Sequence, residues 1–433
     1  MKQSVALVWL RRDLRLNDHA ALYHALRENE EVLPVFIFDS NILEDLPRND
    51  RRVAFIHQEL KRLQEELLAL GSTLLVEKGA PLAVWKELTT RYKITAVYAN
   101  EDYEPYARQR DVAVTEWLQQ QGVLVKWYKD HVIFSGNEVL KDDGSPYTVY
   151  TPYSRKWLAR LKPFYYKAYP VQKYLPAFAK LPATQFPSLQ QIGFQEEATS
   201  FPARVIPGKI ISGYHETRDL PAIQGTSQLG VHLRFGTLSI RQLLAYALPR
   251  NEVYVKELIW RDFYQQILWH FPYVATGSFR SEYDQIAWRN NEQEFACWCS
   301  GNTGYPLVDA GMRELNATGY MHNRVRMVTA SFLTKHLLID WRWGERYFAE
   351  KLLDFDLAAN NGGWQWAAGT GTDAAPYFRI FNPQSQQEKF DKQLTYVRRW
   401  VPEYGTAAYV QPIVDHAMAR QRCLKAYQQA LGK

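Results

Sequence analysis

Residues 354–383 of this chain read DFDLAANNGGWQWAAGTGTDAAPYFRIFNP, and their side chains suit chemistry more than ordinary packing. The stretch combines three aspartates, an Asn-Asn pair, two adjacent glycines and two tryptophans. Asn360 and Trp364 stand four residues apart, so on a helix they share one face. Aromatic rings, amide groups and bare backbone at this density favour a site for a flat, redox-active ring system.

The same stretch carries glycines and carboxylates that a ligand can use. Gly362 and Gly363 let a ligand approach the backbone closely. Asp354 and Asp356 precede them, and a carboxylate there can accept from an imide N–H or pair with an arginine. Capping of a helix is a competing role for either aspartate.

A second set of candidate residues lies in residues 253–270, VYVKELIWRDFYQQILWH. On a helix, Glu257, Trp260 and Arg261 fall at i, i+3 and i+4, on one face. A carboxylate, an indole and a guanidinium side by side do not make a normal core stripe. The competing interpretation is an exposed Glu–Arg pair beside a core tryptophan, and the residues alone favour it.

Two more segments complete the set. In residues 319–341, Asn323 and Met327 are i, i+4 neighbours and Arg326 flanks them; a plain amphipathic helix with a methionine in its core is the alternative. In residues 224–234, QGTSQLGVHLR, a Gly-Thr-Ser turn ahead of an apolar helix can present donors to phosphate. Tyr214 and Arg218, just upstream, can stack and bind an anion.

The elements that must position these residues follow two patterns. Short apolar runs at 5–9, 32–38, 73–77, 96–100 and 123–127 alternate with amphipathic stretches such as 51–70 and 107–121, which predicts a doubly wound parallel α/β sheet. No GxGxxG follows the first run, where WLRRDLRLND stands instead, so a standard dinucleotide site there is disfavoured. After about residue 211 only helical patterns occur, as at 239–248, 253–270, 321–340 and 344–352.

Composition narrows the class of protein. The 433 residues are 46% hydrophobic and 23% charged, as in an ordered globular protein, and include 14 tryptophans. A net charge of +6 suits a polyanion if it gathers on one face. Cys297, Cys299 and Cys423 lack the partners of a zinc site and are interpreted as structural, so we expect no metal. No targeting or membrane-spanning segment is evident, and we expect a cytoplasmic protein.

The four segments together resemble the cryptochrome/photolyase family, and within it the class I cyclobutane pyrimidine dimer photolyases. The resemblance is carried by ELIWRDFY, by GYPLVDAGMRELNATGYMHNRVRM and by LLIDWRWGERYFAEKLLDFDLAANNGGWQWAAGTGTDAAPYFRIFNP, in this order, and by the opening motif WLRRDLRLND. It covers essentially the whole chain. It implies an α/β antenna domain over residues 1–129, a connector over 130–201 and an all-helical FAD-binding domain over 202–433.

By motif matching, the resemblance assigns a set of positions to FAD: Tyr214, Thr226, Ser227, Gln228, Leu229, Arg261, Asn323, Arg326, Asp354, Asp356 and Asn360. Tyr214 and the turn 226–229 would hold the phosphates, with Arg261 beside them. Asp354 would pair with Arg326, and Asp356 would accept from the flavin imide. Asn360 would face the flavin N5, where a neutral amide can hydrogen-bond the reduced ring. Gly230 departs from the serine that the family commonly has, which removes one expected contact.

The resemblance assigns a second set to damaged DNA: Arg218, Glu257, Trp260, Asn323, Arg324, Met327 and Trp366. Glu257 would hydrogen-bond the dimer and stabilise its radical anion. Trp260 and Trp366 would pack on the flipped-out bases. Asn323 would bind the second base, Met327 would line the pocket, and the two arginines would engage the backbone. Trp364, Trp341 and Trp288 match the family's chain of tryptophans, which photoreduces the flavin.

These matches imply a monomeric DNA-repair lyase in which light-excited, reduced anionic FAD passes one electron to a pyrimidine dimer and regains it. A six-four photolyase would carry a histidine at position 323. A cryptochrome photoreceptor usually has a C-terminal extension, whereas this sequence ends at Lys433. A flavin-binding module without light chemistry would leave Glu257 and Trp260 unexplained.

The antenna pigment is the remaining expectation. Folate-using relatives have an Asn-Glu pair in the segment matching residues 106–107, and this chain lacks it. Asp102 and Glu104 in EDYEPYARQRD match the deazaflavin-using relatives better. A deazaflavin, another flavin-like pigment and an empty antenna site all stay open.

Overall fold

The computed structural model describes residues 3–196 and 200–432, which form two compact units. The first unit comprises Met1–Ser135, Leu161–Ile206 and Leu229–Leu248, and the second comprises Gly136–Arg160, Pro207–Gln228 and Pro249–Lys433. The chain therefore passes between the units several times. The predicted division at residues 129 and 201 stays a prediction, and the compact units cut the chain at other points.

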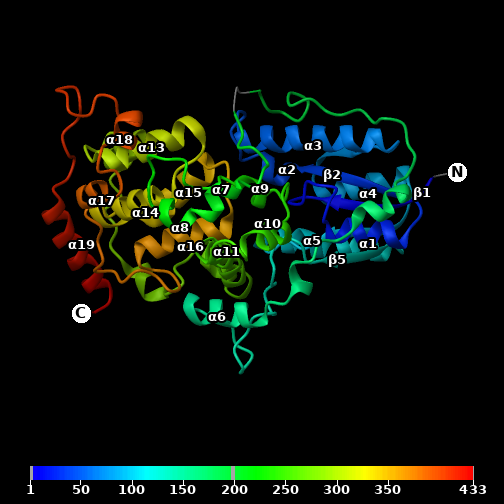
Figure 1. The fold of residues 1–433 in the computed structure, drawn as a ribbon, viewed down its shortest axis with the longest axis horizontal. Coiled ribbons are helices and arrows are strands. Elements are labelled where there is room, and N and C mark those ends of the chain that lie inside the picture. Colours follow the sequence, from blue (N-terminus) through cyan, green and yellow to red (C-terminus); the bar gives the residue numbers. More distant parts are fainter. Residues whose placement is uncertain (1–2, 197–199, 433) are drawn as a thin grey trace. The chain divides into compact units, whose positions relative to one another are not determined.

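The first unit is an α/β layer structure with one parallel sheet, drawn in blue to cyan in Figure 1. Its strands are β1 (Ser4–Leu10), β2 (Val32–Asp39), β3 (Leu75–Gly79), β4 (Lys93–Asn100) and β5 (Leu124–Tyr128). Its helices are α1 (Ala20–Glu28), α2 (Ser40–Leu43), α3 (Arg51–Ala69), α4 (Pro81–Arg91), α5 (Pro105–Gln120), η1 (Pro163–Tyr166), η2 (Val171–Ala177), α9 (Gly230–Arg234) and α10 (Ile240–Ala247).

The sheet has the order β3-β2-β1-β4-β5, and every pairing is parallel. The strand β2 is buried along its whole length, as expected for a strand covered on both faces. The chain order reverses between β1 and β4, which is the switch point where open α/β sheets bind ligands. The predicted doubly wound sheet is confirmed.

Strand β3 begins two residues later than the predicted run at 73–77. The reason is local, because Thr73 is buried and its hydroxyl bonds with the side chains of Gln64 and Thr184. Thr73 therefore anchors the chain ahead of the strand instead of pairing in the sheet.

The second unit is helical and contains no strand among its described residues. Its helices are α6 (Tyr150–Arg160), α7 (Gly208–Ser212), α8 (Tyr214–Thr217), α11 (Glu252–His270), η3 (Pro272–Ala275), η4 (Ser281–Gln285), α12 (Glu292–Ser300), α13 (Pro306–Thr318), α14 (Asn323–Ser331), η5 (Phe332–His336), α15 (Trp341–Lys351), α16 (Leu357–Ala368), α17 (Pro383–Phe390), α18 (Thr395–Trp400) and α19 (His416–Ala430). The predicted all-helical character is confirmed, and the helix predicted over 321–340 is divided into α14 and the π-helical turn η5.

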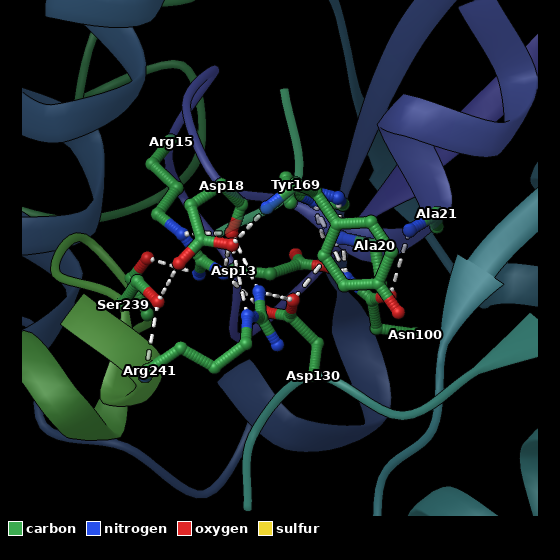
Figure 2. Close-up of polar contacts among 12 residues, drawn as sticks. Asp13, Arg15, Asp18, Ala20, Ala21, Asn100, Asp130, Tyr169, Ser239 and Arg241 are labelled. Carbon is green, nitrogen blue, oxygen red and sulfur yellow. Dashed lines mark hydrogen bonds and ion pairs between the residues drawn. The ribbon is translucent and has the colours of Figure 1, made fainter. Parts of the chain in front are cut away.

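Helix α10 was predicted to lie in the helical domain, yet it belongs to the α/β unit. A buried ion network explains this placement (Figure 2). Arg241 of α10 donates to Asp18 at 2.8 Å and to Asp130 at 2.7 Å, and Arg15 donates to Asp130 at 2.5 Å. All four side chains are buried, so the network ties α10 to the loops that follow β1 and β5.

Candidate functional site

Helix α11 carries the three residues that were predicted to share one helical face. The side chain of Asn251 caps the helix by accepting from the N–H of Tyr254, and the helix ends just before Pro272. Within it, Glu257, Trp260 and Arg261 are all half-buried. The structure therefore supports neither a fully exposed Glu–Arg pair nor a core tryptophan.

Trp260 is held flat against a tyrosine that sequence reasoning missed. Its ring stacks on Tyr150 with ring centroids 3.7 Å apart and planes 2° from parallel. The Tyr150 hydroxyl donates to the carbonyl of Lys256, and the Tyr150 N–H donates to Asp373. These bonds fix an aromatic surface beside Glu257. No spacing in the sequence links Tyr150 to Trp260, because they come from different elements.

Glu257 forms an ion pair with Arg218, whose Nη1 lies 2.6 Å from Oε1. The two side chains are 30% and 29% exposed. Burial raises the pKa of Glu257, Arg218 opposes that rise, and the nearby carboxylate of Asp219 adds to it. The structure thus brings together two residues that were predicted to meet DNA separately.

Helix α14 presents the next predicted residues. Its first residue, Asn323, is exposed, and His322 caps the helix by accepting from the N–H of Arg324. Arg324 is not free: its Nη2 lies 2.7 Å from Oδ1 of Asp219, and its guanidinium lies 4.4 Å from the centre of the Phe390 ring. Met327 is half-buried, with its sulfur 3.8 Å from Nη1 of Arg324. Asp219 was missed, although it directly follows Arg218 in the sequence.

The predicted phosphate turn is lined by tyrosine hydroxyls. Thr226 Oγ1 lies 2.8 Å from the hydroxyl of Tyr320, and Ser227 Oγ lies 2.9 Å from that of Tyr254. Tyr214 packs edge-on against Tyr254 with ring centroids 5.1 Å apart.

The end of the turn has an unusual backbone. Gln228 is exposed and has a φ of 52°, a value that L residues adopt uncommonly. Leu229 is buried and falls in the α/β unit. Tyr254 and Tyr320 are the residues that sequence reasoning missed here, although Tyr254 stands three residues before Glu257 on the same helical face.

Both predicted flavin-binding carboxylates have protein partners. Arg326 Nη2 donates to both oxygens of Asp354, at 3.1 and 3.0 Å, as the motif implied. Asp356 caps α16 by accepting from the N–H of Ala359, and it also accepts from Gln265 Nε2 at 2.9 Å. Asp356 therefore does cap a helix, which was the competing interpretation of this residue.

Asn360 has a fixed amide orientation. Its Nδ2 donates to the carbonyl oxygen of Glu345 at 3.1 Å and to Oε1 of the same residue at 2.8 Å. Because the amide nitrogen is engaged with Glu345, the carbonyl oxygen of Asn360 is left to accept from a ligand N–H. Burial raises the pKa of Glu345, which sequence reasoning did not identify.

The two glycines of α16 differ in surroundings. A Cβ on Gly362 would lie 2.2 Å from the Tyr264 ring, so this glycine makes room for a side chain. A Cβ on Gly363 would meet nothing within 4 Å. A ligand can therefore approach the backbone closely at Gly363. At Gly362 the Tyr264 ring already explains why a side chain does not fit.

The three predicted electron-carrying tryptophans lie in or against one hydrophobic cluster. Trp341 and Trp364 are buried within it, and Trp288 packs against it while partly exposed. Within the described chain, the indole nitrogens of Trp341 and Trp364 have no hydrogen-bond partner. Trp288 lies edge-on to Tyr427 with ring centroids 6.0 Å apart. Trp366, predicted to meet a base, is half-buried near Phe381.

In the α/β unit, the predicted antenna segment is tied to arginines. Arg12 Nη1 lies 3.0 Å from Asp102 and 3.0 Å from Glu104, and Arg234 lies 2.7 Å from Glu104. Burial opposes the charged form of Asp102, but Arg12 holds its pKa well below the usual range. The antenna pigment stays a prediction.

The donor set of the helical unit fits FAD. The hydroxyls of Thr226 and Ser227 suit phosphate oxygens, and the oxygen of Asn360 suits a ring N–H. Among the residues that the structure describes, no group of three His, Cys, Asp or Glu side chains is placed to hold a metal ion. No helix in the described ranges is long and apolar enough to cross a membrane.

Comparison with known proteins agrees with this geometry. Residues 254–429 match the family described as the FAD binding domain of DNA photolyase, and residues 6–177 match the family described as DNA photolyase. A deoxyribodipyrimidine photo-lyase of Synechococcus sp. is 40% identical, over 97% of this chain and 95% of the relative. The Escherichia coli (strain K12) deoxyribodipyrimidine photo-lyase is 38% identical, over 98% of each chain.

Solved structures show the same fold. A bacterial class III photolyase from Agrobacterium tumefaciens superposes with a TM-score of 0.89 at 33% identity, covering 100% of this chain and 99% of that one. An archaeal photolyase from Sulfolobus tokodaii, solved with two FAD molecules, gives a TM-score of 0.84 at 34% identity over 98% of this chain and 100% of that one. Membership of class I therefore stays a prediction. With an FAD-binding helical unit, a parallel α/β unit and full-length relatives that are enzymes of this kind, the chain belongs to the DNA photolyase family.

Proposed function

We propose that this protein repairs cyclobutane pyrimidine dimers in DNA with light. The observation that carries the proposal is the surface of α11, where Glu257 lies beside the stacked Trp260–Tyr150 pair and is ion-paired to Arg218. A carboxyl group next to an aromatic wall suits a flipped-out pyrimidine dimer, which stacks on the wall and is hydrogen-bonded at its edge. When bound, FAD supplies the light absorption and the electron that splits the dimer.

The residues of this chain have separable tasks in that reaction. Arg218 and Arg324 bind backbone phosphates and position the damaged strand. Trp260 and Trp366 receive the extruded bases, with Asn323 and Met327 beside them. The Asn360 carbonyl, fixed by Glu345, orients the flavin ring by accepting a hydrogen bond. Glu257 stabilises charge where it develops on the dimer.

Two alternatives are disfavoured by particular residues. A six-four photolyase would have a histidine in place of Asn323, the exposed first residue of α14. A cryptochrome photoreceptor shares the fold, as a Synechocystis cryptochrome does with a TM-score of 0.85 at 25% identity, so the fold does not decide. A photoreceptor without repair has no need for Glu257 at the aromatic wall. The predicted monomeric state and cytoplasmic location stay predictions.

The deciding experiment uses DNA and light. FAD-loaded, reduced protein is titrated in the dark with dimer-containing, six-four-containing and undamaged oligonucleotides at several salt concentrations, and then illuminated. We expect selective binding of the dimer, by up to a few kcal/mol because a damaged base pair costs less to flip, weaker binding at high salt, and repair of that lesion alone. Equal affinity for all three DNAs without repair, or repair of only the six-four lesion, would overturn the proposal.

A second experiment tests the predicted tryptophan chain. In Trp364→Phe, photoreduction of oxidised FAD should be lost, because one member of the matched tryptophan chain is removed. Repair by chemically reduced protein should survive, since that electron comes from the flavin. Normal photoreduction in the variant would show that electrons enter by another route.

A further inference from the structure

Both arginines that we propose to bind DNA phosphates are already paired with carboxylates. Arg218 Nη1 lies 2.6 Å from Glu257 Oε1, and Arg324 Nη2 lies 2.7 Å from Asp219 Oδ1. Asp219 also lies 3.9 Å from Nε of Arg218, so the two pairs adjoin. The side chains of Arg218 and Glu257 are 29% and 30% exposed, and those of Arg324 and Asp219 are 18% and 40% exposed.

Such pairs can exchange partners. A partly exposed ion pair contributes little stability, and a phosphate offers arginine the same bidentate, charge-assisted bonds as a carboxylate. A DNA phosphate that takes Arg218 leaves Glu257 without its counter-ion. A phosphate that takes Arg324 likewise leaves the Asp219 carboxylate uncompensated nearby.

The surroundings of Glu257 decide what happens next. The hydroxyl-bearing rings of Tyr150, Tyr214, Tyr254 and Tyr264 lie within electrostatic reach of Glu257. On α11 itself, Lys256 is paired with Glu252, and Arg261 stands one turn further along. The cation paired with Glu257 is Arg218, and the carboxylate of Asp219 acts on Glu257 in the opposite sense by raising its pKa.

We propose that binding of damaged DNA withdraws Arg218 from Glu257, and that Glu257 then takes up a proton and meets the dimer as a neutral acid. This inference rests on the proposed function and deepens it. The guanidinium moves from carboxylate to phosphate, and one proton passes from solvent to a carboxylate oxygen of Glu257. No electron is gained or lost by Glu257.

A neutral acid suits the reaction better than a carboxylate. An ionised carboxylate only accepts hydrogen bonds, whereas the protonated group donates one O–H and still accepts. Its O–H can donate to a carbonyl of the dimer, and this bond strengthens as negative charge develops there. The raised pKa of Glu257 agrees with this, because burial already favours the neutral form and Arg218 opposes it.

The test is calorimetry of the FAD-loaded protein in the dark with a dimer-containing duplex. Two buffers of equal pH and different ionisation enthalpy report the protons taken up, from about pH 6 to about pH 8. We expect uptake of up to about one proton per complex, so that log affinity falls by up to about one for each pH unit. Infrared difference spectra should show a protonated carboxyl band on binding.

Two variants assign the proton to its residue. Glu257→Gln should abolish the proton uptake and the infrared band, because an amide does not titrate in this pH range. Glu403→Gln is the matched control: Glu403 pairs with Arg313 at 2.7 Å and is 29% exposed, yet lies outside the proposed site. It should leave the uptake unchanged.

Arg218→Gln tests the exchange itself. It removes the counter-ion before DNA arrives, so the free protein should already favour the neutral acid and the uptake should shrink. Selective dimer binding by the wild-type protein without proton uptake, or uptake that persists in Glu257→Gln, would overturn the inference and leave the proposed function standing. Absence of selective binding would overturn the proposed function instead.

Discussion

The two compact units use the same arginine–carboxylate chemistry in opposite ways. In the α/β unit, Arg15 and Arg241 share Asp130 in a network whose side chains are nearly inaccessible (Figure 2). In the helical unit, Arg218–Glu257 and Arg324–Asp219 have similar distances, but each side chain remains partly exposed. Distance therefore does not distinguish the two sets, and burial does.

Burial separates a structural ion pair from an exchangeable one. Breaking a buried pair leaves a charge that neither water nor a ligand can reach, so the network holds its segments in one arrangement. A partly exposed pair can be opened by any anion that reaches its arginine. The first set positions the loops that follow β1 and β5, and the second is suited to receive phosphates.

The largest effect should follow from breaking the buried network. Asp130→Asn removes the charge that Arg15 and Arg241 share, and we expect a loss of about 3–5 kcal/mol in the free energy of unfolding at neutral pH. Thermal unfolding followed by circular dichroism measures it. Burial opposes the charged form of Asp130, but Arg15 and Arg241 hold its pKa below the usual range.

The pH dependence provides a control for this prediction. A depressed folded-state pKa contributes stability above the unfolded value, about 3.9 for aspartate, and that stability is lost as pH falls through the folded value. The gap between wild type and Asp130→Asn should therefore narrow in acid below about pH 4. A gap that stays constant there would contradict the charged role of Asp130.

The sheet and the helices were largely predictable from the sequence. Continuous apolar runs such as β2 have few alternatives to a buried parallel strand, and the caps of α11 and α16 lie in the sequence beside the helices they start. Membership of α10 in the α/β unit was not predictable, because it depends on Arg241 meeting Asp18 and Asp130, more than 100 residues away.

The residues of the candidate site likewise fall into those that sequence spacing predicts and those that it does not. Residues that share a helical face, such as Glu257 and Trp260, were found from their spacing. Tyr150, Asp219 and Glu345 were missed, because each touches the site across elements and has no periodic relation to its partner. The pairing of Arg218 with Glu257 was hidden for the same reason.

Removing the exchangeable carboxylate should affect chemistry rather than folding. In Glu257→Ala, FAD and DNA binding should be kept, while the repair yield per absorbed photon falls several-fold, on the scale of one lost charge-stabilising group or less. Quantum yields measured with the reduced protein and dimer DNA give the answer. The same measurement on Glu403→Gln should give the wild-type value, and an unchanged yield in Glu257→Ala would remove the role assigned to Glu257.

Removing the exchangeable arginine, Arg218, should mainly weaken the binding of DNA. Arg218→Gln should change the free energy of unfolding by less than about 1 kcal/mol, in contrast to Asp130→Asn. With one phosphate contact fewer, the slope of log affinity against log salt concentration should become shallower by about 0.9 on duplex DNA. Fluorescence anisotropy over a salt series measures it, and an unchanged slope would mean that Arg218 stays with Glu257 in the complex.

The smallest expected effect is a change in the free energy of unfolding whose sign differs between the two sets of ion pairs. The pKa of Glu257 is raised by burial despite Arg218, so the folded state favours the neutral form. That preference stabilises the fold below the unfolded value, about 4.3 for glutamate, and is lost as pH rises through the folded value. Glu257→Gln should therefore be slightly more stable than wild type at neutral pH, by less than about 1 kcal/mol, with the difference vanishing in acid. Asp130→Asn moves the other way at neutral pH, so unfolding curves of both variants over one pH series decide whether burial separates these ion pairs. A loss of stability in Glu257→Gln comparable to that of Asp130→Asn would show that the Arg218 pair is structural too.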